Sequence, residues 1–528
     1  MLLTNNTNGN YTMRQLKLPL EIEKLIDISD PVYTFCEVMD HIDLSRYFVE
    51  KGYKTGRPRC DKQKLLKVIL FAFMENGICS LREIEKFCRN DIRYMYLLDG
   101  MKAPSFATFG NLIRNELTNS VEQIFTDINA YIFDKDHVDL QHTYIDGTKI
   151  EANANRYTWV WKKSCTRNRQ KVFEKISLLI DAMNQEVLGY LGIKFEKREE
   201  YAVDYVSELL LMYKEATGLN EKSFVFGRGH RKDIRQKQFE KLLEYQERLK
   251  NYAYHIKICG KERNSYSKTD HDATFMRLKR DYMGNDQFLP AYNLQAAICD
   301  EYIAVIDVKP YVSDVECFVP LMEKFNHIYS HYPKYPVADA GYGSYNNYLY
   351  YEEHGMGKYM KFTMYKKETT DKKYHKNPYR AVNFAKDENG NLICPNGRKF
   401  IFKRTQHVKY NKYGRTEELY ECESCERCPY KQECCPKAHK NRTIRMNQKL
   451  TAIHQEILTN LECIHGALLR MNRSIQSEEI FGILKWDKSY KRLFRRGEKN
   501  VILELTLISC GFNLYKYHNK KQRQRQAA

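Results

Sequence analysis

Apolar residues recur at helical spacing through the N-terminal part of the chain, residues 31–133. The nearly continuous apolar run Leu65–Gly77 predicts a buried helix that ends at the glycine. Ser80 and Glu83 match a capping box and predict the start of a short helix. Short helices that carry basic side chains and are joined by tight turns indicate a helix-turn-helix layout. An ordinary helical bundle with solvated charges would give the same spacing.

Four later stretches show the pattern of β-strands. The first and the third carry a single aspartate toward their ends, Asp146 and Asp339. The second predicts a hairpin around a two-residue turn, and a helix follows it from Asp314 to about Ile328. Strands and helices in this order indicate an α/β domain. The four stretches are residues 143–148, 292–310, 335–343 and 358–367.

Two polar and charged stretches interrupt this α/β pattern. Residues 160–288 are rich in Lys and Glu, with apolar residues three and four apart, which predicts long exposed helices or a coiled hairpin. Residues 368–450 are polar and basic and carry clustered cysteines, and a last helical pattern covers residues 470–517. The final residues are basic and lack periodicity, so we expect an irregular tail. The predicted parts are a helical N-terminal domain (1–135), an α/β domain with two inserts (136–518) and the tail (519–528).

The charge of the chain narrows the choice of partner. It has 86 Lys and Arg against 67 Asp and Glu, a formal net charge of +19. Such an excess indicates a polyanion, most often nucleic acid, unless the charge only aids solubility. The longest apolar runs fall short of the roughly 18 residues of a membrane span, and the N-terminus lacks a secretory signal. We therefore expect a cytoplasmic protein that binds DNA and no membrane.

The cysteines suggest a second kind of site. The chain has 16 cysteines, and five of them lie between Cys422 and Cys435. The first four of these follow the spacing C-x2-C-x2-C-x5-C, which would let thiolates share one tetrahedral zinc ion. A reduced, metal-free loop is the alternative. The predicted ligands are Cys422, Cys425, Cys428 and Cys434.

Asp146 and Asp339 suit catalysis because side chains at the ends of neighbouring strands project into a shared crevice. In phosphodiester chemistry, carboxylates hold two Mg²⁺ (or Mn²⁺) ions that serve the attacking and leaving oxygens. Mg²⁺ takes few protein carboxylates, so two or three acids suffice. Taken alone, Asp146 before Gly147 could belong to a hairpin turn, and Asp339 could be a cap.

A third acid is expected from the last helical stretch. Glu478, Gly482 and Lys485 stand at positions i, i+4 and i+7 and therefore share one helix face. Gly482 would leave that face open to a DNA backbone, and Lys485 could contact a phosphate. A glycine inside a helix costs roughly 1 kcal/mol relative to alanine, which suggests a reason for its presence. A solvated Glu-Lys surface helix is the alternative.

Taken together, these motifs resemble one known family, the DDE transposases of bacterial insertion sequences. The resemblance covers most of the chain, and its motifs occur in the family's order. They are residues 56–58, 76–85 and 104–109 in the N-terminal part, 144–149 around the first acid, 269–273 and 292–295 before the second, 337–343 around the second, and 473–482 with 496–513 around and after the third. The cysteine-rich insert from Tyr420 to Cys434 is also similar.

The resemblance implies an RNase H-like mixed sheet flanked by helices and interrupted by inserts, with an all-α DNA-binding domain in front. It implies that Asp146, Asp339 and Glu478 hold Mg²⁺ or Mn²⁺. It also implies DNA contacts, for which we name Lys485 and Arg473 beside the third acid and Arg57, Arg59 and Arg82 in the N-terminal domain.

The function implied is transposition. The enzyme would bind the terminal repeats of its element, cleave DNA at the element ends, and join the freed 3′-hydroxyl to target DNA as a homo-oligomer on DNA. Two alternatives stay open. One is a catalytically inactive DNA-binding relative, and the other is an RNase H-like nuclease that hydrolyses DNA without strand transfer.

Overall fold

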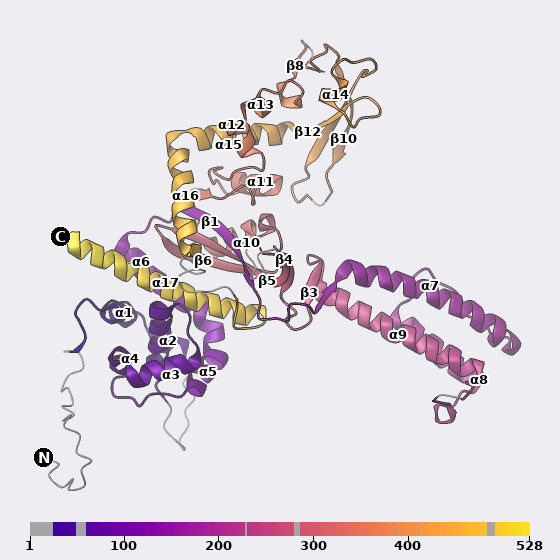
Figure 1. The fold of residues 1–528 in the computed structure, drawn as a ribbon, viewed down its shortest axis with the longest axis horizontal. Coiled ribbons are helices and arrows are strands. Elements are labelled where there is room, and N and C mark those ends of the chain that lie inside the picture. Colours follow the sequence, from indigo (N-terminus) through magenta and orange to yellow (C-terminus); the bar gives the residue numbers. More distant parts are fainter. Residues whose placement is uncertain are drawn as a thin grey trace, which may run out of the picture.

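A computed structural model shows a mixed α/β chain in which helices surround a central sheet (Figure 1). It contains the mixed sheet and the helical N-terminal region that the sequence predicts. Within the part of the chain that is described, no helix is long and apolar enough to cross a membrane. The structure describes residues 25–48, 60–227, 230–278, 286–388, 390–409, 411–482 and 492–527.

The N-terminal region is a bundle of helices around the predicted apolar helix. That helix, α2, has nine buried side chains and ends at Gly77, whose φ of 69° is favourable for glycine. The capping box of Ser80 and Glu83 is present at the start of α3, as predicted. The helices are α1 (Pro31–Asp40), α2 (Lys62–Asn76), α3 (Leu81–Asn90), α4 (Ile92–Leu98), α5 (Phe106–Leu112) and α6 (Thr118–Asp136).

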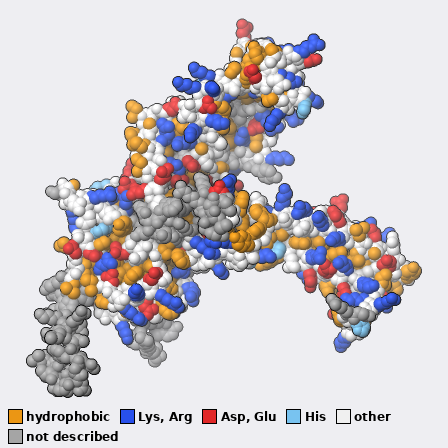
Figure 2. Space-filling model, in the orientation of Figure 1, with side chains coloured by type: hydrophobic (Ala, Val, Ile, Leu, Met, Phe, Trp, Pro, Cys, Tyr) orange, Lys and Arg blue, Asp and Glu red, His pale blue; other side chains and the backbone are white. Residues whose placement is uncertain are grey.

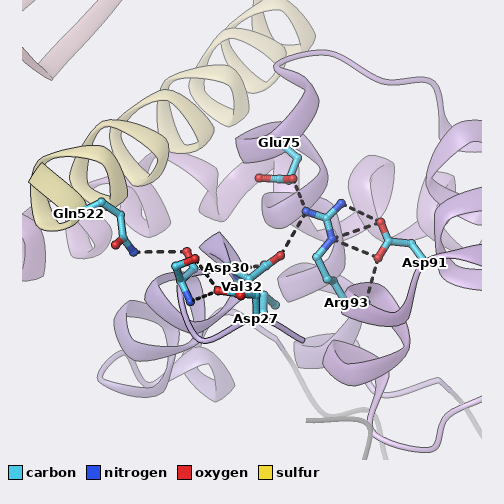
Figure 3. Close-up of polar contacts among 8 residues, drawn as sticks. Asp27, Asp30, Val32, Glu75, Asp91, Arg93 and Gln522 are labelled. Atoms are coloured by element: carbon cyan, nitrogen blue, oxygen red, sulfur yellow. Dashed lines mark hydrogen bonds and ion pairs between the residues drawn. The ribbon is translucent and has the colours of Figure 1, made fainter. Parts of the chain in front are cut away.

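Arg93 of α4 ties several of these segments together (Figure 3). Its guanidinium lies 2.5 Å from Glu75 of α2, 2.8 Å from Asp91 and 3.8 Å from Asp30, the N-cap of α1. Hydrogen bonds to charged partners are stronger than neutral ones. This basic side chain therefore links α1, α2 and α4 within the bundle.

The central sheet has β1 in its middle. β1 (His142–Glu151) pairs antiparallel with β5 (Phe288–Cys299) on one side and parallel with β7 (Tyr335–Val337) on the other. β6 (Tyr302–Lys309) and β4 (Thr274–Arg277) both pair antiparallel with β5, which places them beyond it. The predicted hairpin is thus β5 and β6. Asp146 lies within β1 as predicted, whereas β7 is shorter than the predicted stretch 335–343 and Asp339 follows it by two residues.

The strand predicted over Lys358–Lys367 is wrong. Residues 358–364 are irregular, and α12 (Tyr365–Thr370) begins inside the predicted range. Side chains 358–360 are buried, as those of β5 and β6 are, so burial does not distinguish this segment from a strand. Its backbone bonds locally instead, since the Tyr359 amide donates to the Gly357 carbonyl at 3.0 Å and the Tyr365 amide to the Phe362 carbonyl at 2.9 Å. It still lies beside β7, because the Gly357 amide donates to the Lys334 carbonyl at 2.9 Å and the Lys361 amide to the Ala338 carbonyl at 3.3 Å.

The C-terminal helix α17 (Glu498–Ala527) joins the sheet to the N-terminal bundle (Figure 1). It contacts α2, α6 and β6, and one hydrophobic core extends from α1 through the sheet into α17. Gly511 permits the closest approach, since a Cβ there would lie 2.5 Å from the carbonyl carbon of Phe73 in α2.

The expected irregular tail is also helical, as the last part of α17. Lys520 donates to the Asp300 carbonyl at 2.8 Å and lies 3.4 Å from the Asp136 carboxylate. Lys521 pairs with Glu37 of α1. Lys520 and Lys521 therefore pair with groups from distant segments of the chain. The local pattern of apolar residues does not predict such partners.

The first insert is a helical hairpin that projects away from the sheet (Figure 1). Helices α7 (Lys162–Glu186) and α9 (Ile234–Cys259) pack against each other, α8 (Val203–Thr217) packs on α9, and the three share a core of their own. At the base, β2 (Trp159–Trp161) pairs with β3 (Ser265–Ser267). The long helices are as predicted.

The cysteine-rich insert contains a separate three-stranded antiparallel sheet. Its strands are β10 (Phe400–His407), β11 (Thr416–Cys422) and β12 (Thr443–Met446). The chain then forms α15 (Gln448–Glu462) and α16 (Ile464–Gly482), and α16 returns to pack on β1.

Over the face shown in Figure 2, Lys and Arg side chains are spread across the N-terminal bundle, the helical hairpin and the cysteine-rich insert instead of forming one patch.

Candidate active site

The register of the sheet brings Asp146 and Asp339 together. Tyr144 of β1 lies opposite Val337 of β7 in parallel pairing, and each aspartate follows two residues later. Both carboxylates are near the guanidinium of Arg473, whose Nη2 lies 2.7 Å from Asp146 Oδ1 and 3.8 Å from Asp339 Oδ2. The two predicted acids therefore meet at one place.

Helix α16 places Arg473 there through its buried face. Leu469, Ser477 and Ile480 are buried at helical spacing, and Arg473 stands on the same face with its side chain 13% exposed. Its Nε also donates to the Ile145 carbonyl at 3.4 Å. Arg473, predicted as a DNA contact, thus contacts the Asp146 and Asp339 carboxylates.

Burial raises the pKa of Asp146 above its ordinary value. The nearby charge of Arg473 and the Gly147 amide, which donates to Asp146 Oδ1 at 2.9 Å, oppose that rise, while Asp339 adds to it. A carboxylate that is desolvated in this way and faces a second carboxylate favours a positive charge between the two.

Glu478 has a different environment. It lies on the exposed side of α16 and accepts a hydrogen bond from the Ser474 hydroxyl at 3.2 Å. Its neighbour Glu479 is 2.8 Å from Lys516 of α17. Among the described residues, no atom would lie within 4 Å of a Cβ at Gly482, the glycine that shares a helix face with Glu478.

The described residues contain no group of three or more His, Cys, Asp or Glu side chains placed to hold a metal ion. The pair of Asp146 and Asp339 nevertheless suits a hard divalent cation. Mg²⁺ is usually bound by one or two carboxylates, with waters and substrate phosphates as its other ligands. The guanidinium of Arg473 already brings positive charge to these carboxylates.

Four polar residues beside this pair were missed in the sequence analysis. Tyr342 donates to Gln295 Oε1, and Gln295 Nε2 donates to Asn293 at 2.9 Å and to Asp314 at 3.3 Å. Asn293 Nδ2 donates to the same oxygen of Asp314 at 2.7 Å. The sequence does carry a signal for two of them. Asn293 and Gln295 stand two positions apart in an otherwise apolar strand, so their amide side chains face the same side of it.

The basic residues predicted to contact DNA fall into three groups. Arg57, Arg59 and Lys485 lie outside the described residues. Arg82 is exposed near the start of α3, and its guanidinium lies 5.3 Å from the centre of the Phe106 ring. Arg473 contacts the two aspartates, as described above.

The cysteines are divided between a small core and a polar edge. Cys422 and Cys425 are buried with apolar residues that include Phe400 and Ile444. Cys434 accepts a hydrogen bond from Arg442 Nη1 at 2.8 Å. Burial raises the pKa of the Cys422 thiol to about 12, which opposes the thiolate form that binds metal. As arranged in the described residues, these thiols do not form a zinc site.

Three family models match the chain. Residues 20–115 match a model described as Transposase domain (DUF772). Residues 263–452 and 393–518 match two models, each described as Transposase DDE domain. No curated protein and no solved structure matches the chain significantly.

The matched stretches include α1–α5 of the N-terminal bundle, Asp339 with its strand, and α16 with Glu478. Asp146 precedes the two DDE matches, and the sheet places it beside Asp339. The chain therefore belongs to the DDE transposases of insertion sequences.

Proposed function

We propose that this transposase binds the terminal repeats of its element and catalyses metal-dependent DNA cleavage and strand transfer. One observation carries the proposal. Asp146 of the central strand β1 and Asp339, which follows the neighbouring strand β7, both lie beside the Arg473 guanidinium. Glu478 would complete the acidic set from the open face of α16.

In this mechanism Asp146 and Asp339 would hold a divalent cation, Mg²⁺ or Mn²⁺, and Glu478 would help to hold a second one. Bound there, the cation would supply the Lewis acidity that phosphodiester cleavage needs at the attacking and leaving oxygens. Arg473 keeps the two carboxylates adjacent and brings positive charge to the point where a DNA phosphate would enter. The open surface around Gly482 leaves room for the DNA backbone.

We propose that DNA contacts are spread over several parts of the chain. The net charge of +19 and the scattered Lys and Arg side chains of Figure 2 support this proposal. Arg82 on α3 is a candidate contact in the N-terminal bundle, together with Arg57 and Arg59. Pairing of two element ends would require at least a dimer on DNA.

The test is cleavage and joining of DNA that carries the element ends, with Mg²⁺ present. Wild type should cut and join, whereas Asp146→Asn, Asp339→Asn and Glu478→Gln should lose both reactions by at least about 10²-fold. Glu479→Gln is the matched control, because its carboxylate pairs with Lys516.

Each alternative predicts a different outcome. A nuclease would cut without joining, and an inactive relative would bind the ends with no cleavage by any variant. Cleavage by Asp146→Asn at the wild-type rate would show that the acids are wrongly assigned.

Zinc binding by Cys422, Cys425, Cys428 and Cys434 stays a prediction from the spacing, and it would require these thiols to converge. Elemental analysis of purified protein that has not met a chelator tests it. One zinc per chain is the expected content, and a trace amount would contradict the prediction.

A further inference from the structure

A carboxylate outside the predicted acidic set approaches the active site from the opposite side of the sheet. Asp314 begins a short turn, Asp314–Glu316, directly after β6. A Cβ built on Gly341 would lie 2.9 Å from Asp339 Oδ1 and 3.6 Å from Asp314 Oδ2. The two carboxylates, from different segments, therefore come close to the same point.

Asp314 is held in place by β5. Its Oδ1 accepts from Asn293 at 2.7 Å and from Gln295 at 3.3 Å, and both amides are completely buried. No described hydrogen bond or ion pair uses its Oδ2. Two buried donors therefore fix the carboxylate through one oxygen and leave the other toward Gly341 and Asp339.

The same amides connect Asp314 to both catalytic strands. Gln295 lies opposite Gly147, the residue after Asp146, and its side chain crosses above that glycine. Gln295 also accepts from Tyr342, three residues after Asp339. Contacts of Gln295 therefore link Asp314 to the residues that follow each aspartate.

Local structure does not explain this acid. The described hydrogen bonds of the Asp314 side chain go to β5, and none goes to its own turn or to α10 (Phe318–Tyr329), which begins after it. Its two described partners are neutral amides from β5, to which an uncharged oxygen could also bond, although less strongly.

We propose that Asp314 is a positioning residue of the active site, which orients the Asp339 loop and adds negative charge for a divalent cation. The inference rests on the proposed function, because it assumes that Asp146 and Asp339 hold that cation. Residues that surround metal ligands commonly change metal affinity by 10- to 100-fold when they are replaced.

The experiment is calorimetric titration of the full-length protein with Mn²⁺, without DNA. Asp314→Asn keeps an oxygen for Asn293 and Gln295 but removes the charge, so we expect an affinity at least about 10-fold weaker. Glu316→Gln is the matched control, since this exposed acid in the same turn should leave the affinity unchanged. Asp314→Ser serves as a second uncharged variant, and melting temperatures establish that each variant is folded.

The outcomes separate this inference from the proposed function. If Asp314→Asn or Asp314→Ser is folded and binds Mn²⁺ as tightly as wild type while Asp146→Asn does not, the role of Asp314 is refuted and the metal site stands. If wild type and Asp146→Asn bind Mn²⁺ equally, the proposed function itself fails. A loss in Asp314→Asn and not in Glu316→Gln supports the inference.

Discussion

Gly147 is the residue at which β1 and β5 leave no space for a side chain. A Cβ there would lie 2.9 Å from Gln295 Cδ and closer still to its amide nitrogen. The glycine after the first acid thus serves packing, and the hairpin turn that Asp146-Gly147 could have indicated does not form, because both residues lie within β1.

Gly147→Ala should displace Gln295 and with it the contacts to Tyr342 and Asp314. We expect a loss of roughly 1–3 kcal/mol in unfolding free energy, as in other overpacked sites, and slower DNA cleavage. Chemical denaturation and cleavage rates measure the two effects. Gln295→Ala removes the group that clashes, so the two changes combined should cost less stability than the sum of the single ones. Unchanged stability in Gly147→Ala would contradict the argument.

His454 gives a pH-dependent contribution to stability. It is stacked on Phe362, with ring centres 4.3 Å apart, and burial lowers its pKa below the ordinary value of 6.5. The unfolded chain therefore takes up a proton more readily than the folded one, and stability falls as the pH drops below about 6.5.

Replacing His454 with Phe should reduce that loss. We expect the melting temperature of wild type to fall more between pH 7.5 and pH 5.5 than that of His454→Phe. Equal slopes for the two proteins would show that His454 does not titrate on unfolding. The melting temperature of His454→Phe should still fall somewhat with pH, because burial also lowers the pKa values of His255 and His518.

Among the site residues, the sequence identifies those that stand in a recognisable local pattern and misses those that meet only when distant strands pair. Asp146 and Asp339 stand at recognisable places on strands, so both could be named in advance. Asn293, Gln295 and Asp314 come together only through the register of β1, β5 and β6. That register depends on contacts between distant segments.

At the scale of elements, Gly511 sets how closely α17 packs on α2. Its Cβ position lies 2.5 Å from the Phe73 carbonyl carbon and 2.6 Å from its oxygen. Backbone atoms cannot move aside as a flexible side chain can, so any larger residue must separate the helices.

Gly511→Val should therefore destabilise the protein by roughly 1–3 kcal/mol or more. Ser509→Ala is a control on the same helix, because the Ser509 hydroxyl bonds only to the Leu505 carbonyl one turn earlier. Unfolding in denaturant compares the two variants. If Gly511→Val is as stable as Ser509→Ala, the close packing is not important for stability.

The helices were the most predictable elements, since their periodicity and caps are local. The capping box at Ser80 and the long hairpin helices needed no tertiary information. The strand at 358–367 is wrong because the backbone there forms local turn bonds and then enters α12, which the apolar pattern does not reveal. The tail failed because Lys520 and Lys521 find partners far away in the sequence.

At the scale of the whole molecule, the N-terminal helices and the sheet share one hydrophobic core. The predicted boundary at residue 135 coincides with the end of α6 at Asp136, but α17 packs across it on α2 and α6. Hydrophobic periodicity locates elements, and it does not show that the last helix returns to the first ones.

Removing residues 1–135 should therefore expose the apolar face of α17. We expect the shortened chain, 136–528, to lose cooperative thermal unfolding, because its burial of apolar surface depends on the missing helices. Circular dichroism during heating tests this expectation. A cooperative transition close to that of the full chain would show that the α/β part is stable by itself.

The central claim is that Asp146 and Asp339 hold the divalent cation used in DNA cleavage. The most direct measurement is cleavage of end-bearing DNA by Asp339→Cys in Mg²⁺ and in Mn²⁺, since a thiolate is a poor ligand for Mg²⁺ and a better one for softer metals. We predict no cleavage by this variant in Mg²⁺ and partial recovery in Mn²⁺, with wild type active in both. Cleavage by Asp339→Cys at the wild-type rate in Mg²⁺ would contradict the account.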